Sequence, residues 1–275
     1  MSREGVVSLP EGRAGARPVP FRGGGFRHRR HPLVSPLVFL IVLCLWELLC
    51  RYGIISTIVL PAPTAAFAAF LDLVRTGLLW KNLGASLYRL SIGWTLGTIL
   101  GIVAGLLIGL FPLARAGLQP LVSALFPIPK IALLPLFVIW FGIGEGSKVA
   151  VILFGAFFPT VIATYGGVDN VDRNLIRMGQ SFGLSRLSIV RKIIIPGALP
   201  AILSGFRISV SIAIVLLVAA EMIGARYGIG AYILEAGALF ATDKLIAGVA
   251  ILSLFGLVIA WAIGRAEHIL LKWRL

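Results

Sequence analysis

Residues 88–111 read YRLSIGWTLGTILGIVAGLLIGLF, an apolar stretch whose single charged residue, Arg89, lies near its start. A helix needs about 20 apolar residues to cross the hydrocarbon core of a bilayer, so this stretch is long enough to span one. Glycine recurs at every fourth position, which on a helix forms one slowly turning groove of small residues: Gly93, Gly97, Gly101, Gly105 and Gly109. We interpret the groove as a helix-packing face. Its partner is a helix of the same subunit or of a second copy, and the pattern leaves this open.

Five further apolar runs have comparable length. They lie at about residues 33–51, 121–141, 148–166, 201–221 and 245–264. Hydrophobic residues make up 59% of the chain and charged residues 13%, about half the charged share of a typical soluble domain. The sequence therefore predicts an all-α integral membrane protein with six transmembrane helices.

The net charge of +14 would also suit a nucleic-acid-binding protein. The basic residues do not form one stripe, however; they lie between the apolar runs, where contact with lipid phosphates and membrane topology explain them better. We therefore expect a lipid partner and no nucleic acid. Of the 25 lysines and arginines, 17 fall in segments that lie inside if the N-terminus is inside, and 7, among them Arg89 and Lys148, in segments that lie outside. The positive-inside rule then places both termini in the cytoplasm.

The segments outside the spans have their own character. Residues 1–31 are rich in Arg, Gly and Pro and predict a disordered basic cytoplasmic tail, leaving residues 32–275 as one transmembrane domain. The apolar run after the tail is too long for a cleavable signal peptide. The stretch 61–80 predicts an interfacial helix, and the glycine-rich stretch 222–243 predicts a broken or re-entrant segment near the outer face.

Two ionisable residues fall within or beside the spans. Lys130 stands in the third run among Pro127, Pro129 and Pro135, and a lysine at the bilayer centre costs roughly 2.5–3.5 kcal/mol, so it should face a cavity or extend to the headgroups. Both interpretations remain open. Glu221 closes the fifth run, where it could line the translocation path or accept hydrogen bonds from backbone amides that the broken segment frees.

The remaining candidate residues, an acid–base pair, two cysteines and three histidines, are not expected to take part in function. Glu47 and Arg51 are four residues apart, in the favourable order for an ion pair on one helix. Cys44 and Cys50, inside or beside the first run, are expected to be buried small hydrophobes. The three histidines are scattered without metal-ligand spacing. We predict no metal site and no cofactor.

The loop at 166–200 carries the most informative pattern. Residues 172–185 read DRNLIRMGQSFGLS, in which Asp172 suits a helix N-cap and Gly183 the left-handed position that ends a helix. Ser185 can cap a second short helix, which Pro196 should stop. The first helix has an apolar stripe at spacings of three and four, formed by Leu175, Met178 and Phe182. This pair of short helices either lies on lipid or docks on a partner protein.

These residues resemble a known family. Gly183 followed after nine residues by Ile193-x-Ile195-Pro196 is similar to the loop signature Glu-Ala-Ala…Gly…Ile-x-Leu-Pro of binding-protein-dependent ABC importer permeases. Four other stretches resemble the aliphatic sulfonate, nitrate and taurine branch of that family: LPAP (60–63), PIPKIALLP (127–135), WFGIGEGSK (140–148) and AEMIG (220–224). The resemblance covers about residues 33–275.

The resemblance implies a type I ABC importer permease fold, with six spans and a cytoplasmic coupling loop at 166–200. The ATPase-coupling residues would be Leu175, Arg177, Met178, Gly179, Phe182, Gly183 and Pro196. One departure stands out: Arg177, Met178 and Gly179 occupy the positions expected to read Glu-Ala-Ala, so a cation replaces the usual acid. The resemblance also implies a bacterial plasma (inner) membrane location, a dimer of this subunit or of close paralogues, a cytoplasmic ATPase dimer and an extracytoplasmic binding protein.

The chain itself lacks the Gly-x-x-x-x-Gly-Lys-Ser/Thr phosphate loop. We therefore expect a non-catalytic subunit that receives energy through the loop. The resemblance favours a small solute such as a sulfonate, nitrate or taurine-like anion, with a pyrimidine-type vitamin precursor as the alternative. A secondary transporter, the rival class, should show inverted repeats and midplane carboxylates, and we find no convincing repeat. A channel is a weaker third possibility, because it leaves the loop signature unexplained.

Overall fold

A computed structural model describes residues 34–272 of the chain, and within that range every regular element is a helix. The predicted tail at 1–31 lies outside the described residues. The chain divides into two units, residues 1–45 and 46–275. In the first unit, the described residues form the beginning of α1 (Val34–Arg51), and most of their side chains are exposed. The rest of the fold belongs to the second unit.

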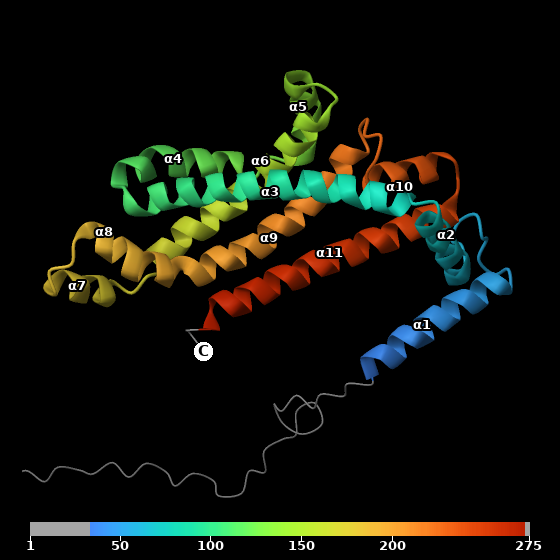
Figure 1. The fold of residues 1–275 in the computed structure, drawn as a ribbon, viewed down its shortest axis with the longest axis horizontal. Coiled ribbons are helices and arrows are strands. Elements are labelled where there is room, and N and C mark those ends of the chain that lie inside the picture. Colours follow the sequence, from blue (N-terminus) through green and yellow to red (C-terminus); the bar gives the residue numbers. More distant parts are fainter. Residues whose placement is uncertain (1–33, 273–275) are drawn as a thin grey trace, which may run out of the picture. The chain divides into compact units, whose positions relative to one another are not determined.

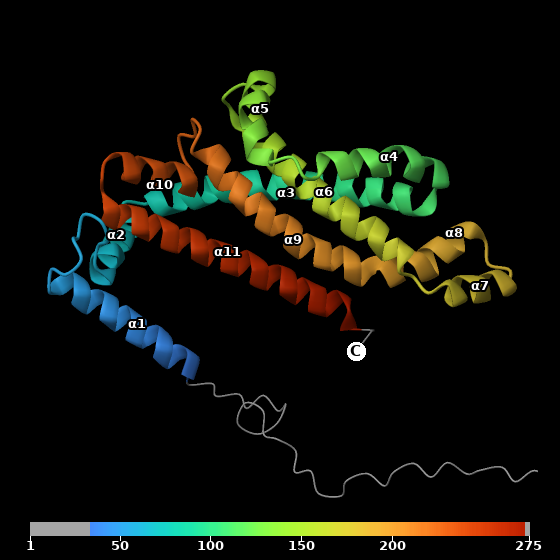
Figure 2. The same cartoon turned by 180° about the vertical axis from the view of Figure 1, so that it is seen from behind.

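Three long helices form the centre of the second unit. They are α3 (Leu78–Leu110), α6 (Glu145–Asp169) and α9 (Ile195–Glu221), and they run side by side in both views (Figures 1 and 2). The core of α6 is the most deeply buried, since Ile152, Ala156 and Val161 have no exposed surface. We infer that α6 is the central helix because it packs against both α3 and α9.

The glycine groove of α3 faces α6. A Cβ atom added at Gly97 would lie 2.4 Å from the carbonyl oxygen of Leu153, and one added at Gly105 would lie 2.5 Å from Cβ of Thr164. The other three glycines also meet α6 at 2.8 Å. Only glycine permits this approach of two backbones. The partner helix that the sequence left open is therefore α6 of the same chain.

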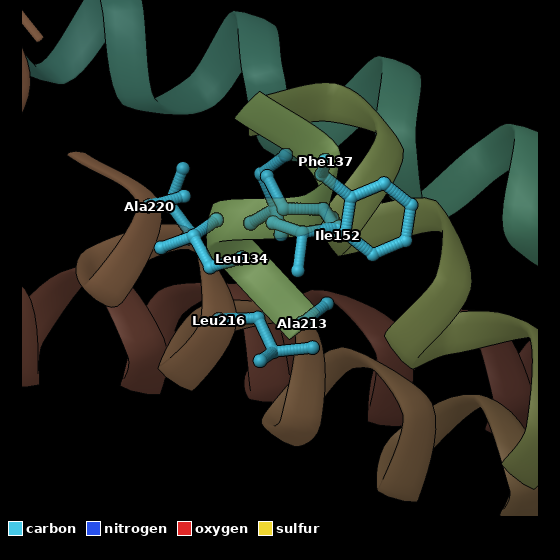
Figure 3. Close-up of a cluster of buried hydrophobic side chains, with 9 residues drawn as sticks. Leu134, Phe137, Ile152, Ala213, Leu216 and Ala220 are labelled. Carbon is cyan, nitrogen blue, oxygen red and sulfur yellow. The ribbon is translucent and has the colours of Figure 1, made fainter. Parts of the chain in front are cut away.

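A second contact joins α9 and α6 to α5 (Leu134–Phe141). Leu134 and Phe137 of α5 pack against Ile152 of α6 and against Ala213 and Leu216 of α9 (Figure 3). All five side chains are at most 7% exposed. This cluster holds the short helix α5 against the middle of the long helices.

Two pairs of short helices lie at opposite ends of this bundle. Helices α7 (Arg173–Ser181) and α8 (Arg186–Ile189) lie at one end. Helices α2 (Pro63–Arg75) and α10 (Ile229–Ala238) lie at the opposite end in both views. The last long helix, α11 (Thr242–Leu270), runs along the bundle beside α9.

Within residues 34–272, four continuous helices are long and apolar enough to cross a membrane: α3, α6, the joined helix Arg186–Glu221 and α11. A fifth candidate is the bent pair described below, and α1, with 18 residues, occupies the first predicted run. That α1 is the sixth span remains a prediction from its composition.

The third predicted span, 121–141, is wrong as a continuous helix. Helix α4 begins earlier, at Pro112, and ends at Leu125; a 3₁₀ turn, η1 (Lys130–Leu133), then leads into α5. The two parts are bent by 92°. Pro127 and Pro129 explain the break, because each lacks an N–H group and its ring clashes with the preceding helical turn.

The prediction that Pro196 stops the second short helix is also wrong. Helix α8 continues through a π-helical segment, η2 (Val190–Ile194), directly into α9, giving one helix from Arg186 to Glu221. Pro196 lies in the first turn of α9, just after the π-helical widening of the backbone. A π-bulge changes the hydrogen-bond pattern locally, so the missing N–H of proline is tolerated there.

The predicted boundary before the second span needs correction as well. Helix α2 covers only part of the predicted interfacial stretch 61–80, and Gly77, at φ 73°, separates it from α3. Helix α3 then begins ten residues before the predicted run, so Arg89, which the charge count placed in an outer segment, lies inside a long helix. The stretch 222–243 is broken as predicted, into a turn and the short helix α10.

Candidate functional site

The predicted coupling loop folds as two short helices with the expected caps. The Asp172 carboxylate accepts a hydrogen bond from the backbone N–H of Asn174 at 2.8 Å, and the Ser185 hydroxyl oxygen accepts one from that of Ser188 at 3.3 Å. Gly183 has φ 71°, the left-handed conformation predicted for it. The local sequence alone therefore sets the turn between α7 and α8.

One face of this pair packs inward. A Cβ atom at Gly179 would lie 2.8 Å from Cδ1 of Ile193, so α7 sits close to η2. Val171, Ile189 and Ile194 form the buried cluster beneath it. Gly179 thus serves as a small contact residue between α7 and the base of α9. This contact fixes α7 to the first end of the joined helix Arg186–Glu221.

The outward face is apolar and exposed. Leu175 is 46% exposed, Met178 51% and Phe182 78%. Leu187, on the neighbouring helix α8, is a further exposed apolar side chain, at 68%. We call these four residues the docking patch. Five exposed cations lie on α7, α8 and the π-helical segment η2, and none of them forms an ion pair within residues 34–272: Arg173, Arg177, Arg186, Arg191 and Lys192.

The opposite end of the bundle is held by a buried ion network around Arg89. Its Nη1 donates to Oε1 of Glu221 at 2.8 Å and to the carbonyl oxygen of Tyr227 at 2.7 Å. Its Nε and Nη2 donate to the two carboxylate oxygens of Glu145 at 2.6 and 2.8 Å. The bidentate geometry is the favourable one for arginine and a carboxylate. One side chain therefore joins α3, α6 and the end of α9.

Glu221 is fully enclosed by this network. Its carboxylate also accepts hydrogen bonds from the Ser86 hydroxyl at 2.7 Å and from the backbone N–H of Gly230 at 2.9 Å. Of the two roles considered for Glu221, the structure therefore shows the bonding of a freed amide. Sequence reasoning missed Arg89; the signal was a lone charge inside a helix-length apolar run.

The stretches 140–148 and 220–224, which resembled the same family, meet at this network through Glu145 and Glu221. Lys148 lies beside them and is 2% exposed, and its Nζ donates to the carbonyl oxygens of Ile143 and Gly144 at 2.7 and 3.0 Å. Lys148 therefore fastens the turn before α6 to the first turns of that helix. The charge count had placed it in an outer loop, whereas the structure buries it.

Lys130 lies at the break between α4 and α5. Its ammonium group contacts the carbonyl oxygen of Phe126 and lies over the rings of Phe126 and Phe158, 4.9 and 5.1 Å from their centroids. It lines a cavity of about 360 Å³ between the break and α9, together with Ile131, Ser211, Ile212, Val215 and Leu216. The ammonium group itself lies on Phe126 and Phe158, which do not line this cavity, and the surface of the cavity is almost wholly apolar.

The remaining charged residues lie in peripheral pairs. Glu47 accepts a hydrogen bond from Arg51 at 2.8 Å, as predicted, and also accepts one from the Thr64 hydroxyl at 2.9 Å. Arg115 pairs with Asp169, and Arg207 pairs with Glu267 at 2.6 Å. Within residues 34–272 no group of three or more His, Cys, Asp or Glu side chains could hold a metal ion.

Comparison with known proteins gives consistent matches. A family model described as "Binding-protein-dependent transport system inner membrane component" matches residues 97–268. The chain is 34% identical over 276 residues to a candidate aliphatic sulfonates transport permease protein of Bacillus subtilis (strain 168), covering 100% of this chain and 98% of the relative. It is 35% identical over 238 residues to the taurine transport system permease protein of Escherichia coli (strain K12), covering 85% and 86% of the two chains.

The fold also matches a solved structure. A chain of the methionine ABC transporter MetNI, in an inward-facing crystal form, superposes with a TM-score of 0.63 at 20% identity. The match covers 71% of this chain and 97% of the other. At this identity the likeness concerns the fold alone.

Proposed function

This chain belongs to the family of binding-protein-dependent transport system inner membrane components, and from this premise we propose how it works as the permease subunit of an ABC importer. It forms the membrane pathway for a solute that an extracytoplasmic binding protein delivers. A cytoplasmic ATPase dimer supplies the energy. Two copies of the chain, or the chain and a close paralogue, enclose the pathway between them.

The observation that carries this proposal is the α7–α8 pair with its docking patch. The joined helix from Arg186 to Glu221 has 36 residues, which at 1.5 Å per residue is about 54 Å. The hydrocarbon core is about 30 Å thick, and the whole bilayer about 40–45 Å. At the average helix tilt of about 20°, the helix still spans about 51 Å. The helix is therefore about 6–11 Å longer than the bilayer is thick, and the α7–α8 pair lies at one of its ends, which favours a protein partner over a lipid surface.

A helix with an exposed apolar stripe is suited to a groove on a partner. Phe182 and Met178 would fill the groove of the ATPase, and the five exposed cations would meet acidic groups on its rim. Arg177 differs here from the acidic residue of related loops, so its partner on the ATPase should carry the opposite charge. ATP binding would draw the two α7–α8 pairs of the dimer together and turn the bundle outward.

The orientation follows from this role. The α7–α8 end faces the cytoplasm, and the α2–α10 end, with the Arg89 network, faces outward. Of the seven Lys and Arg residues counted outside, Arg89 and Lys148 are buried in the bundle, so the distribution becomes 17 to 5, which supports this orientation and cytoplasmic termini. The pathway then opens outward near α10 and inward near α7.

A small organosulfonate anion is the solute that we favour, because relatives at 34% and 35% identity are a candidate aliphatic sulfonates permease and a taurine permease. The test is reconstitution of the chain with its ATPase and binding protein in proteoliposomes. Uptake of labelled ethanesulfonate or taurine should require internal ATP and persist when ionophores collapse all ion gradients. Uptake that follows an ion gradient and ignores ATP would contradict the proposal.

A further inference from the structure

The turn between α10 and α11 carries an aromatic side chain on a strained backbone. Phe240 has φ 53° and is the one residue other than glycine with a positive φ within residues 34–272. Its backbone N–H donates to the carbonyl oxygen of Gly237 at 3.1 Å, and the next N–H, that of Ala241, donates to Ala236 at 2.9 Å. This pair of bonds closes a helix around a left-handed position that glycine usually occupies. A phenylalanine there costs conformational energy.

Packing within the described part of the chain does not offset this cost. The side chain of Phe240 is 80% exposed, and that of its neighbour Leu239 is 71% exposed. Glycine or asparagine would form the same turn without the strain. Backbone strain of this kind is typical of functional sites, where a contact made by the strained residue explains it. We therefore looked for the contact that the exposed ring makes.

A second turn brings further apolar side chains to the α10–α11 turn. The hydroxyl of Thr242, the first residue of α11, donates to the carbonyl oxygen of Thr57 at 3.2 Å. The two residues after Thr57, Ile58 and Val59, are also largely exposed. Both turns lie at the α2–α10 end of the bundle, opposite α7 and α8 (Figures 1 and 2). We call the following four residues the outer patch: Ile58, Val59, Leu239 and Phe240.

A cavity with charged walls adjoins the outer patch. Leu239 lines this cavity, which has a volume of about 520 Å³, and so do Arg226, Glu235 and Lys244. These three charged residues are exposed, and none of them forms an ion pair between residues 34 and 272. An apolar centre beside a polar rim is the usual anatomy of a protein–protein interface. The outer patch and the cavity together therefore have the chemistry of a surface that receives a protein.

Contact with lipid explains the outer patch less well. Thr242 lies about 12 residues before the centre of the apolar run 245–264, which is about 18 Å along a helix. Half of the hydrocarbon core is about 15 Å, so the patch lies at the level of the headgroups or beyond. Trp and Tyr are the residues enriched at that level, and the outer patch contains neither. A fluid lipid surface also accepts any side-chain direction, so it gives no reason to hold Phe240 in a strained conformation.

We propose that the outer patch docks the extracytoplasmic binding protein, with the Phe240 ring inserted into an apolar recess of that protein and Arg226 and Lys244 facing acidic groups beside the recess. This inference rests on the proposed function and adds the surface and the anchoring residue by which the chain receives its partner. The left-handed backbone holds the ring in one direction before the partner arrives. Such pre-organisation lowers the entropic cost of binding.

The test uses the permease with its ATPase in lipid nanodiscs, and the binding protein loaded with ethanesulfonate. The measured quantities are the binding-protein concentration that gives half-maximal stimulation of ATP hydrolysis and the unfolding midpoint of the permease. Phe240→Asp should raise this concentration about tenfold and leave hydrolysis without the binding protein unchanged. Phe240→Gly should raise it as well, although the unfolding midpoint stays the same or increases because the strain is relieved. A residue needed only for the turn would not give this combination.

Phe111→Asp is the matched control, because Phe111 is an exposed phenylalanine in the turn between α3 and α4, at the end of the bundle that carries α7 and α8. It should behave as wild type.

A wild-type half-maximal concentration in Phe240→Asp or in Phe240→Gly would overturn the inference. If Phe240→Asp fails to assemble, Ile58→Asp decides: a raised concentration supports the docking surface, and an unchanged one refutes it. Separation of the permease into single copies in Phe240→Asp, measured by light scattering, would assign the outer patch to a contact between copies and refute the proposal. A wild-type transporter whose ATP hydrolysis ignores the loaded binding protein would instead refute the proposed function.

Discussion

At the residue scale, the buried side chain of Arg89 links α3 to α6 and to the end of α9. Its side chain is 4% exposed and forms ion pairs with Glu221, which is fully buried, and with Glu145, which is 54% exposed. Removing one partner of a buried ion pair leaves the other charge uncompensated, and this costs more than the pair itself contributes. The two carboxylates therefore differ: Glu145 can be hydrated without Arg89, whereas Glu221 cannot.

We predict that Arg89→Met destabilises the permease on the order of 3–5 kcal/mol, because Glu221 is left buried and unpaired. The measurement is the unfolding midpoint of the purified protein in detergent. Arg89→Met combined with Glu221→Gln should recover part of the loss. Arg51→Met is the control, because its partner Glu47 can be hydrated and Arg51 is 67% exposed. Equal midpoints for Arg89→Met and Arg51→Met would contradict this account.

At the scale of elements, two contacts between helices dominate. The α3–α6 seam depends on the absence of side chains at five positions of α3, since a Cβ atom at each would lie within 2.9 Å of α6. The α7–α8 pair depends instead on one backbone conformation, at Gly183, and on a patch that nothing else in residues 46–272 covers. The α3–α6 seam holds the bundle together, whereas the α7–α8 pair leaves its docking patch exposed for a partner.

Gly101→Leu should therefore impair assembly of the bundle. Its Cβ would lie 2.8 Å from Cβ of Thr160 and 2.9 Å from the carbonyl oxygen of Phe157, so the two backbones must move apart and lose their close packing. Gly256→Leu is the matched control in α11, where the nearest atom to an added Cβ is 4.0 Å away. Yield and monodispersity after purification are the measurements. If both variants purify equally well, the seam is not essential.

Phe182→Asp should weaken binding of the ATPase while leaving membrane insertion intact, because it places a charge in the docking patch and α7 packs on the bundle through its other face. Co-purification of the ATPase and ATP-driven uptake are the measurements. Phe182→Leu, which keeps an apolar side chain, is the control. Full retention of the ATPase and of transport in Phe182→Asp would show that the patch is not the coupling surface.

Gly183→Val should give a similar loss of coupling by a different cause. At φ 71° a residue with a side chain is strained by roughly 1–2 kcal/mol, although the space around this glycine is open. The strain should misalign α7 with α8. Gly183→Asn is the control, since asparagine tolerates the left-handed conformation. Equal uptake by the Val and Asn variants would mean that this conformation is not required.

At the scale of the whole molecule, the two ends of the second unit differ in chemistry. The α7–α8 end carries unpaired cations and an apolar patch, while the α2–α10 end lies next to the closed Arg89 network. A membrane-impermeant thiol reagent should label Ser185→Cys only after cells are opened, and Thr76→Cys in intact cells, in a background without Cys44 and Cys50. Labelling of Ser185→Cys from outside would invert the orientation and contradict the coupling role.

The sequence alone determined the membrane class, the position of the long helices and the local turns of the coupling loop, because these depend on composition and on contacts within a few residues. Asp172, Gly183 and Ser185 cap their helices wherever the helices lie. The coarse positions of α3, α6, α9 and α11 follow from the lengths of their apolar runs. The resemblance of the loop to a known signature added the family.

Other features depended on contacts between residues far apart, and only the tertiary structure decided them. The sequence could not show that the glycines of α3 face α6, since a groove is compatible with any close helix. It placed Arg89 outside the membrane and missed its bond to Glu221, which is 132 residues away. The sequence predicted one continuous helix across Pro127 and Pro129 and a helix end at Pro196. Both predictions were wrong, because whether a proline breaks a helix depends on the packing around the freed backbone groups.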